Sequence, residues 1–218
     1  MRPFRTHCTE KGRGPPRPGP YYRGARSVAT STPRVLDTPA PHYWTLDEYD
    51  AAVEAGVFVD RRVELLHGDI VDVPPMSDPH IGAVRYLASA FYTQLGWERA
   101  SSQTPIILPT DGQPEPDVAV FEPGAPPKPR VEQVQLVIEV SQSSRQRDLG
   151  TKLADYLRDG LRELWIIDLV EQCALMYRGG QLIARHARGS RARLTAELVP
   201  EVTIDLDAVF DAARLDSV

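Results

Sequence analysis

Apolar side chains recur with the 3.6-residue period of an amphipathic helix in several parts of the chain. The pattern predicts four helices, over residues 45–56, 79–95, 146–158 and 206–215. Thr45 with Glu48 three residues later forms a capping box, which marks the start of the first helix. Gly96 and Gly160 follow the second and third helices, and glycine is a typical helix stop.

Shorter apolar runs bounded by turn residues predict strands between and after these helices. We expect a hairpin over 63–73, strands over 104–108, 117–121, 135–140 and 164–169, and a terminal meander over 173–177, 181–184 and 194–199. The run 135–140 is apolar on both faces apart from Glu139, which is typical of a central strand. The alternation of helices and strands indicates a mixed α/β domain.

Residues 1–42 show neither period, and they are rich in proline, glycine and arginine. This composition predicts a disordered basic tail, followed by one folded domain at 43–218. Three interpretations of the tail stay open: a solvated extension or misassigned start site, a basic arm that touches nucleic acid, and a transit peptide. It contains no apolar core of a secretory signal.

Composition narrows the class of protein. The chain has 218 residues, of which 42% are hydrophobic and 25% charged, which indicates one globular domain and argues against a coiled coil or a collagen-like chain. No apolar run is long enough to cross a membrane. Its two cysteines, Cys8 and Cys173, form no disulfide framework, which favours the cytoplasm. The net charge is −5 although the tail is basic, so the body is acidic and nonspecific binding to nucleic acid through many phosphate contacts is disfavoured.

Acidic residues stand where apolar residues are expected. Glu139 lies inside an apolar strand, and buried carboxylates need a partner or a metal. Asp117 follows Pro116 at the start of another apolar run. Carboxylates on adjacent strands would suit Mg²⁺ or Mn²⁺, and Lys152, one turn after Asp148, would stabilise charge on a phosphate. Taken singly, the three groups also fit a turn acid, an edge-strand glutamate and a solvated lysine.

Together these residues resemble the Uma2 family of bacterial endonucleases. The resemblance rests on Pro116-Asp117, Glu139-Val140-Ser141, Asp148 with Lys152, Arg162 to Leu169, Val63 to Ile70, and Met76-Ser77 with His80. It covers roughly residues 43–178. The family belongs to the PD-(D/E)xK superfamily, so the resemblance implies a restriction-endonuclease-like core of the α/β (α+β) class. This core is a mixed central β-sheet flanked by helices, here with an extra C-terminal β meander.

The resemblance also implies the site. Asp117 and Glu139 match the acidic metal ligands, and the backbone carbonyl of Val140 is a further ligand. Lys152 matches the catalytic lysine. In the superfamily's usual motif this lysine stands two residues after the acid, where this chain has Ser141, whereas in Uma2-like proteins it lies on the following helix.

Other positions have weaker assignments. Glu64, His80 and Asp148 match accessory positions near the site, where the first two would complete the metal shell or bind phosphate; a solvated strand acid and a helix-capping histidine are the alternatives. Trp165 and Tyr156 are interpreted as packing residues. The arginines at positions 145 and 147 are either solvated or contacts to a DNA backbone.

The resemblance therefore implies a Mg²⁺- or Mn²⁺-dependent endonuclease that hydrolyses phosphodiester bonds, with DNA as the favoured substrate. The metal would activate water for in-line attack while Lys152 orients that water or offsets charge. The terminal meander would extend the sheet or support a homodimer. The alternative is a catalytically silent nuclease-fold protein that binds nucleic acid or protein as an accessory module, which the acidic body favours.

Overall fold

The structure is a computed structural model that describes residues 40–142 and 148–214. The chain divides into two units, Met1–Ala40 and Pro41–Val218, and every element below belongs to the second unit. The predicted tail therefore lies almost wholly outside the described residues, as do the arginines at positions 145 and 147. None of the helices in the described ranges has the length and apolar character needed to cross a membrane.

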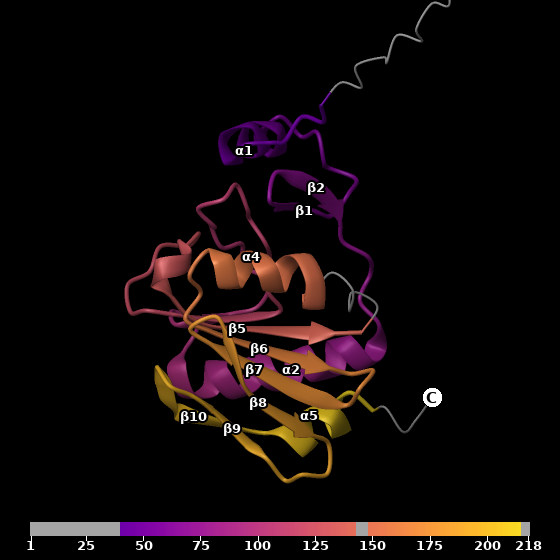
Figure 1. The fold of residues 1–218 in the computed structure, drawn as a ribbon, viewed down its shortest axis with the longest axis vertical. Coiled ribbons are helices and arrows are strands. Elements are labelled where there is room, and N and C mark those ends of the chain that lie inside the picture. Colours follow the sequence, from indigo (N-terminus) through magenta and orange to yellow (C-terminus); the bar gives the residue numbers. More distant parts are fainter. Residues whose placement is uncertain (1–39, 143–147, 215–218) are drawn as a thin grey trace, which may run out of the picture. The chain divides into compact units, whose positions relative to one another are not determined.

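The described elements are mixed in type along the chain (Figure 1). In order they are α1 (Leu46–Glu54), β1 (Val63–Leu66), β2 (Asp69–Asp72), α2 (Asp78–Leu95), β3 (Ala100–Ser101), β4 (Val118–Phe121), η1 (Val131–Gln133), β5 (Val134–Ser141), η2 (Asp148–Lys152), α4 (Leu153–Arg158), β6 (Glu163–Asp168), β7 (Cys173–Arg178), β8 (Gln181–Ala187), β9 (Arg193–Ala196), β10 (Val199–Asp205) and α5 (Leu206–Ala212).

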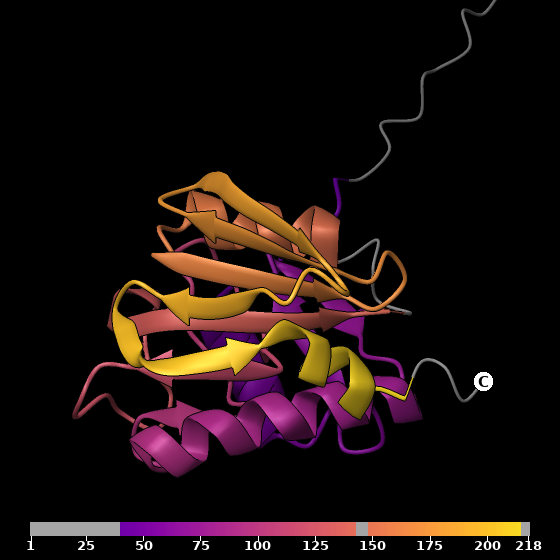
Figure 2. The same ribbon diagram turned by 90° about the horizontal axis from the view of Figure 1, so that it is seen from below.

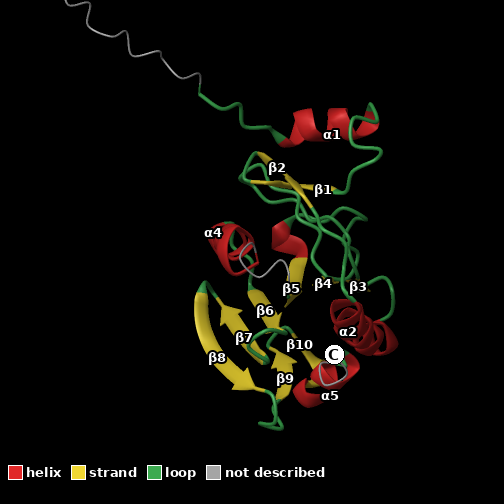
Figure 3. Cartoon of the chain, turned by 90° about the vertical axis from the view of Figure 1, so that its right-hand side faces the viewer, coloured by secondary structure: helices red, strands yellow, loops and turns green. Residues whose placement is uncertain are grey.

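A six-stranded sheet with the order β3-β4-β5-β6-β7-β8 forms the centre of the domain. Only β5 and β6 are parallel, because the chain between them crosses over through η2 and α4; the other neighbours are antiparallel. α4 lies on one side of the sheet, while α2 and α5 lie on the other (Figure 3). The sheet is therefore mixed and flanked by helices, which confirms the expected fold class.

The alternation of side chains along β5 divides the interior into two cores. Leu136, Ile138 and Val140 join the core beneath α2, α5 and β10. Val137 faces the other way, into the core that contains Tyr156 of α4. Glu139 shares the face of Val137, since residues two apart in a strand point to the same side.

Close packing of two helices completes the larger core. α2 and α5 lie side by side (Figure 2). Gly82 of α2 faces the backbone of α5, where a Cβ atom would collide with the carbonyl of Ala212. The missing side chain at this position therefore sets how closely the helices approach.

α1 and the β1–β2 hairpin share a third, small core. The predicted capping box is present, since Thr45 and Glu48 bond reciprocally at the start of α1. Tyr49 is buried with Val63, and its hydroxyl donates to the Val63 carbonyl at 3.2 Å. This core fixes β1, which carries Glu64 into the interior.

Two predicted strands are wrong in detail. Residues 104–108 form no strand, and the edge of the sheet is β3 instead. Pro105 has no N–H, and the pairings that follow it are isolated bridges, from Ile107 to Arg130 and from Leu108 to Gly112. The run 194–199 contains the end of β9 and the start of β10, which form a separate two-stranded sheet, while β7 and β8 extend the main sheet.

Candidate active site

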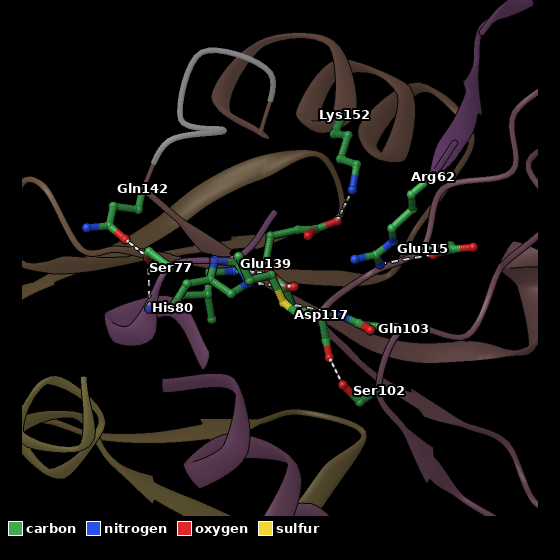
Figure 4. A network of polar contacts seen from close by, with 12 residues as sticks. Arg62, Ser77, His80, Ser102, Gln103, Glu115, Asp117, Glu139, Gln142 and Lys152 are labelled. Atoms are coloured by element: carbon green, nitrogen blue, oxygen red, sulfur yellow. Dashed lines mark hydrogen bonds and ion pairs between the residues drawn. The ribbon is translucent and has the colours of Figure 1, made fainter. Parts of the chain in front are cut away.

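Asp117 is held at the start of β4 by two hydrogen bonds to its carboxylate (Figure 4). The register pairs Val118 with Ile138, so Asp117 lies beside the end of β5. The Val140 N–H donates to Asp117 Oδ2 at 2.8 Å, and His80 Nε2 lies 3.0 Å from Oδ1. An ionised carboxylate only accepts, so a charged Asp117 requires the hydrogen on Nε2. The two contacts fix the orientation of the carboxylate.

Glu139 projects from β5 toward α4 and is only 3% exposed. Its Oε1 accepts hydrogen bonds from Lys152 Nζ at 3.3 Å and from the Tyr156 hydroxyl at 2.8 Å. Among the described residues, no hydrogen bond reaches Glu139 Oε2. One oxygen of this carboxylate is thus bonded twice and the other not at all.

Lys152 is the last residue of η2, a π-helical turn that continues directly into α4. Such turns are frequent at functional sites, because the wider backbone redirects a side chain. The ammonium also donates to Glu64 Oε1 at 3.1 Å, and the same oxygen accepts the Glu115 N–H at 3.3 Å. Lys152 therefore joins β1 to β5 from above the sheet.

Burial and charge set the protonation of these groups. Burial raises the pKa of Glu139 to about 8, and the carboxylates of Asp117 and Asp148 add to that rise while Lys152 opposes it. Burial by itself would lower the pKa of Lys152, but Glu139 and Glu64 outweigh it and hold that pKa above the usual value. Lys152 therefore remains a cation at neutral pH.

A cavity of about 40 Å³ lies between these side chains. It is lined by Arg62, Glu64, Val73, Pro74, Pro75, Met76, His80, Gln103, Glu115, Asp117, Glu139, Asp148 and Lys152. The space exceeds the roughly 10–15 Å³ that one water needs, so an ion or water fits inside. At its lining, Arg62 pairs with Glu115 at 3.1 Å.

The six side chains assigned from the sequence all line this one cavity. They are Asp117, Glu139, Lys152, Glu64, His80 and Asp148. Within residues 40–142 and 148–214, no three His, Cys, Asp or Glu side chains are grouped as a complete metal site. The arrangement is therefore a set of four buried carboxylates with the Lys152 ammonium against two of them, those of Glu64 and Glu139. The carboxylates suit the binding of a cation, and the ammonium suits the binding of a phosphate.

The sequence interpretation missed several residues at the site. Tyr156, interpreted as packing, also bonds to Glu139, and its position four residues after Lys152 was the available signal. Arg62 lies two positions before Glu64, although it precedes the strand itself. Nothing local marks Gln103, which reaches the cavity from a loop.

Comparison with known proteins identifies the family of this chain. A family model named Uma2, described as "Putative restriction endonuclease", matches residues 41–207. This chain belongs to the Uma2 family. The match spans the hairpin, the cavity and the strands up to β10, so the family resemblance seen in the motifs is confirmed.

One solved structure supports the same fold. It is a protein from Anabaena variabilis ATCC 29413, described as a putative nuclease belonging to DUF820, with a TM-score of 0.63 and 18% sequence identity. The similarity covers 78% of this chain and 98% of the other. No curated protein matches this sequence significantly. Uma2 membership and this fold indicate a nuclease of the restriction-endonuclease type, and hence a nucleic-acid substrate.

Proposed function

We propose that this protein is an endonuclease that uses a divalent metal, Mg²⁺ or Mn²⁺, to hydrolyse phosphodiester bonds in DNA. The observation that carries the proposal is the placement of Asp117 and Glu139 beside one cavity with the ammonium of Lys152 3.3 Å from Glu139. Two acids and a lysine suit metal-dependent phosphodiester hydrolysis, because the metal and the phosphate both need partners of opposite charge.

The side chains present fit a divalent ion. Glu139 Oε2 accepts no hydrogen bond from the described residues, and Asp117 offers a second carboxylate on the neighbouring strand. The N–H of Val140 already points toward Asp117, and the N–H and C=O of one strand residue lie on the same side, so the Val140 carbonyl would be a third oxygen. Mg²⁺ is commonly held by one or two carboxylates together with waters and substrate phosphates. When bound, the ion would polarise the phosphodiester and lower the pKa of a water.

Lys152 has a separate task. Because its ammonium stays charged, it would stabilise the negative charge that develops on the phosphate oxygens rather than remove a proton. Glu64 holds the same ammonium at 3.1 Å and so fixes the direction from which the charge acts. A buried ammonium held in this way interacts more strongly with a phosphate than a mobile lysine side chain in water does.

Three further groups prepare the site for the substrate. His80 and the Val140 N–H hold the Asp117 carboxylate, so Asp117 does not have to be ordered when metal arrives. Arg62 is partly exposed at the lining of the cavity, where it would pair with a phosphate of the backbone.

Cleavage assays test the proposal. The substrates are supercoiled plasmid, single-stranded DNA and RNA, each with Mg²⁺, Mn²⁺ or EDTA. Asp117→Asn, Glu139→Gln and Lys152→Met are expected to abolish metal-dependent cleavage, while Glu132→Gln, an exposed acid on η1, keeps it. Cleavage of RNA alone would contradict the DNA substrate. Full activity in all three site variants would contradict the site, and no cleavage of any substrate would favour the accessory binding module.

A further inference from the structure

Tyr156 is a fully buried tyrosine whose hydroxyl lies against the site instead of ending in the apolar core. The ring packs in the core between α4 and the sheet, together with Val137 and Ile166. The hydroxyl donates to Glu139 Oε1 at 2.8 Å. A phenylalanine would fill the same apolar space, so packing alone does not account for the hydroxyl.

The helix brings two donors to the same oxygen. Tyr156 follows Lys152 by four residues, and residues with this spacing share one face of a helix. Both side chains therefore reach Glu139 Oε1, at 2.8 Å and 3.3 Å. Oε2 is left without a hydrogen bond from the described residues, and Glu139 lines the cavity.

We propose that Tyr156 is a positioning residue, which holds the Glu139 carboxylate so that Oε2 is presented to the metal. This role rests on the proposed function, since it presumes a divalent ion at Glu139. A glutamate side chain has three rotatable bonds, and ordering it costs conformational entropy. The buried hydroxyl provides that order before metal arrives, because leaving it unbonded in an apolar core would be unfavourable.

Lys152 alone would not hold the Glu139 carboxylate in one orientation. Its ammonium is shared between Glu64 and Glu139, at 3.1 Å and 3.3 Å. Glu139 is the one hydrogen-bond partner of the Tyr156 hydroxyl among the described residues. Among the described residues, the tyrosine thus donates to a single carboxylate, whereas the lysine divides its ammonium between two.

Tyr156→Phe tests the proposal, with Tyr177→Phe as the matched control. Tyr177 of β7 packs against the same core, and its hydroxyl makes no hydrogen bond to the described residues. The first measurement is the dissociation constant of Mn²⁺ for the full-length protein without DNA, by isothermal titration calorimetry. Removing a hydrogen bond to a metal ligand weakens metal binding by roughly 10-fold or more, and we expect this for Tyr156→Phe alone.

The second measurement is the rate of plasmid cleavage as a function of Mn²⁺ concentration. For Tyr156→Phe, the half-saturating Mn²⁺ concentration should rise by the same factor as the dissociation constant. The rate at saturating metal should return close to wild type, and the KM for DNA should not change. A merely structural role would lower the rate at every metal concentration.

The outcomes separate this proposal from the proposed function. Wild type that binds Mn²⁺ but cleaves nothing would contradict the nuclease, while weaker Mn²⁺ binding by Tyr156→Phe would still support the positioning role. Equal affinity in wild type and Tyr156→Phe would overturn the positioning role, as would an equal loss in Tyr177→Phe. A wild-type protein that binds no Mn²⁺ would overturn both.

Discussion

Lys152 donates a hydrogen bond to Glu64 at 3.1 Å, although 88 positions of sequence separate the two residues. The contact links the β1–β2 hairpin to the turn that precedes α4, so the site depends on two distant segments. It also compensates charge, because the same ammonium lies 3.3 Å from Glu139. Buried carboxylates without such a partner are strongly unfavourable.

Removal of the ammonium should therefore destabilise the protein. Lys152→Met leaves Glu64 buried without its cation, and breaking a buried ion pair from one side costs about 3 to 5 kcal/mol. Urea unfolding at neutral pH in EDTA measures the change in the free energy of unfolding. The control is Lys128→Met, which removes a partly exposed pair with Asp50 and should cost less than about 1 kcal/mol. Equal stability of wild type and Lys152→Met would contradict the assigned contacts.

Glu139 should make the stability of the metal-free protein depend on pH. Its folded pKa of about 8 exceeds the ordinary glutamate pKa of 4.5, so the folded state keeps a proton that the unfolded state loses. The contribution of Glu139 to the free energy of unfolding is therefore fully present below pH 4.5 and is lost as the pH rises toward 8. Glu139→Gln removes this dependence, so its free energy of unfolding should fall less than that of wild type over this interval. Parallel profiles in EDTA would show that the pKa of Glu139 is not raised.

Addition of metal should stabilise the folded protein. A ligand that binds only the folded state raises the melting temperature, so millimolar Mn²⁺ is expected to do so in wild type and in Glu132→Gln. Asp117→Asn removes one proposed ligand and should abolish most of the shift. Differential scanning calorimetry in Mn²⁺ and in EDTA provides the comparison. A shift as large in Asp117→Asn as in wild type would place the metal elsewhere.

The contact between α2 and α5 yields a prediction about the fold alone. Gly82→Ala forces a methyl group against the carbonyl of Ala212, and overpacking of this kind costs about 1 to 3 kcal/mol. Gly150→Ala is the control, because among the described residues no atom from another segment lies within 4 Å of the added Cβ. Chemical denaturation should show a loss for the first variant and none for the second. A Gly82→Ala protein as stable as wild type would mean that the helices are farther apart.

Much of the fold could be predicted from local patterns. The helical period of apolar residues located α2, a short run that is apolar on both faces located β5, and the capping box located α1. Each of these signals lies within the element that it specifies. The placement of Asp117 beside Glu139 could also be predicted from the sequence. A carboxylate buried in an apolar strand needs a partner or a metal, and Asp117 begins another apolar strand.

The remaining features depend on segments that are distant in sequence. Residues 104–108 have the composition of a strand, but Ile107 and Leu108 form only isolated bridges to two different segments, so no continuous ladder forms. The hydrogen bond of Tyr156 to Glu139 could not be separated from packing, because a buried tyrosine satisfies both patterns. Arg62 and Gln103 reach the cavity only through tertiary structure.

One measurement tests the central claim most directly: the rate at which wild type and Glu139→Gln nick supercoiled plasmid in Mn²⁺, each repeated in EDTA. The account predicts nicking by wild type that stops in EDTA and is absent in Glu139→Gln. Equal nicking by both proteins in Mn²⁺ would contradict it, because cleavage would then not depend on the carboxylate that Lys152 and Tyr156 hold.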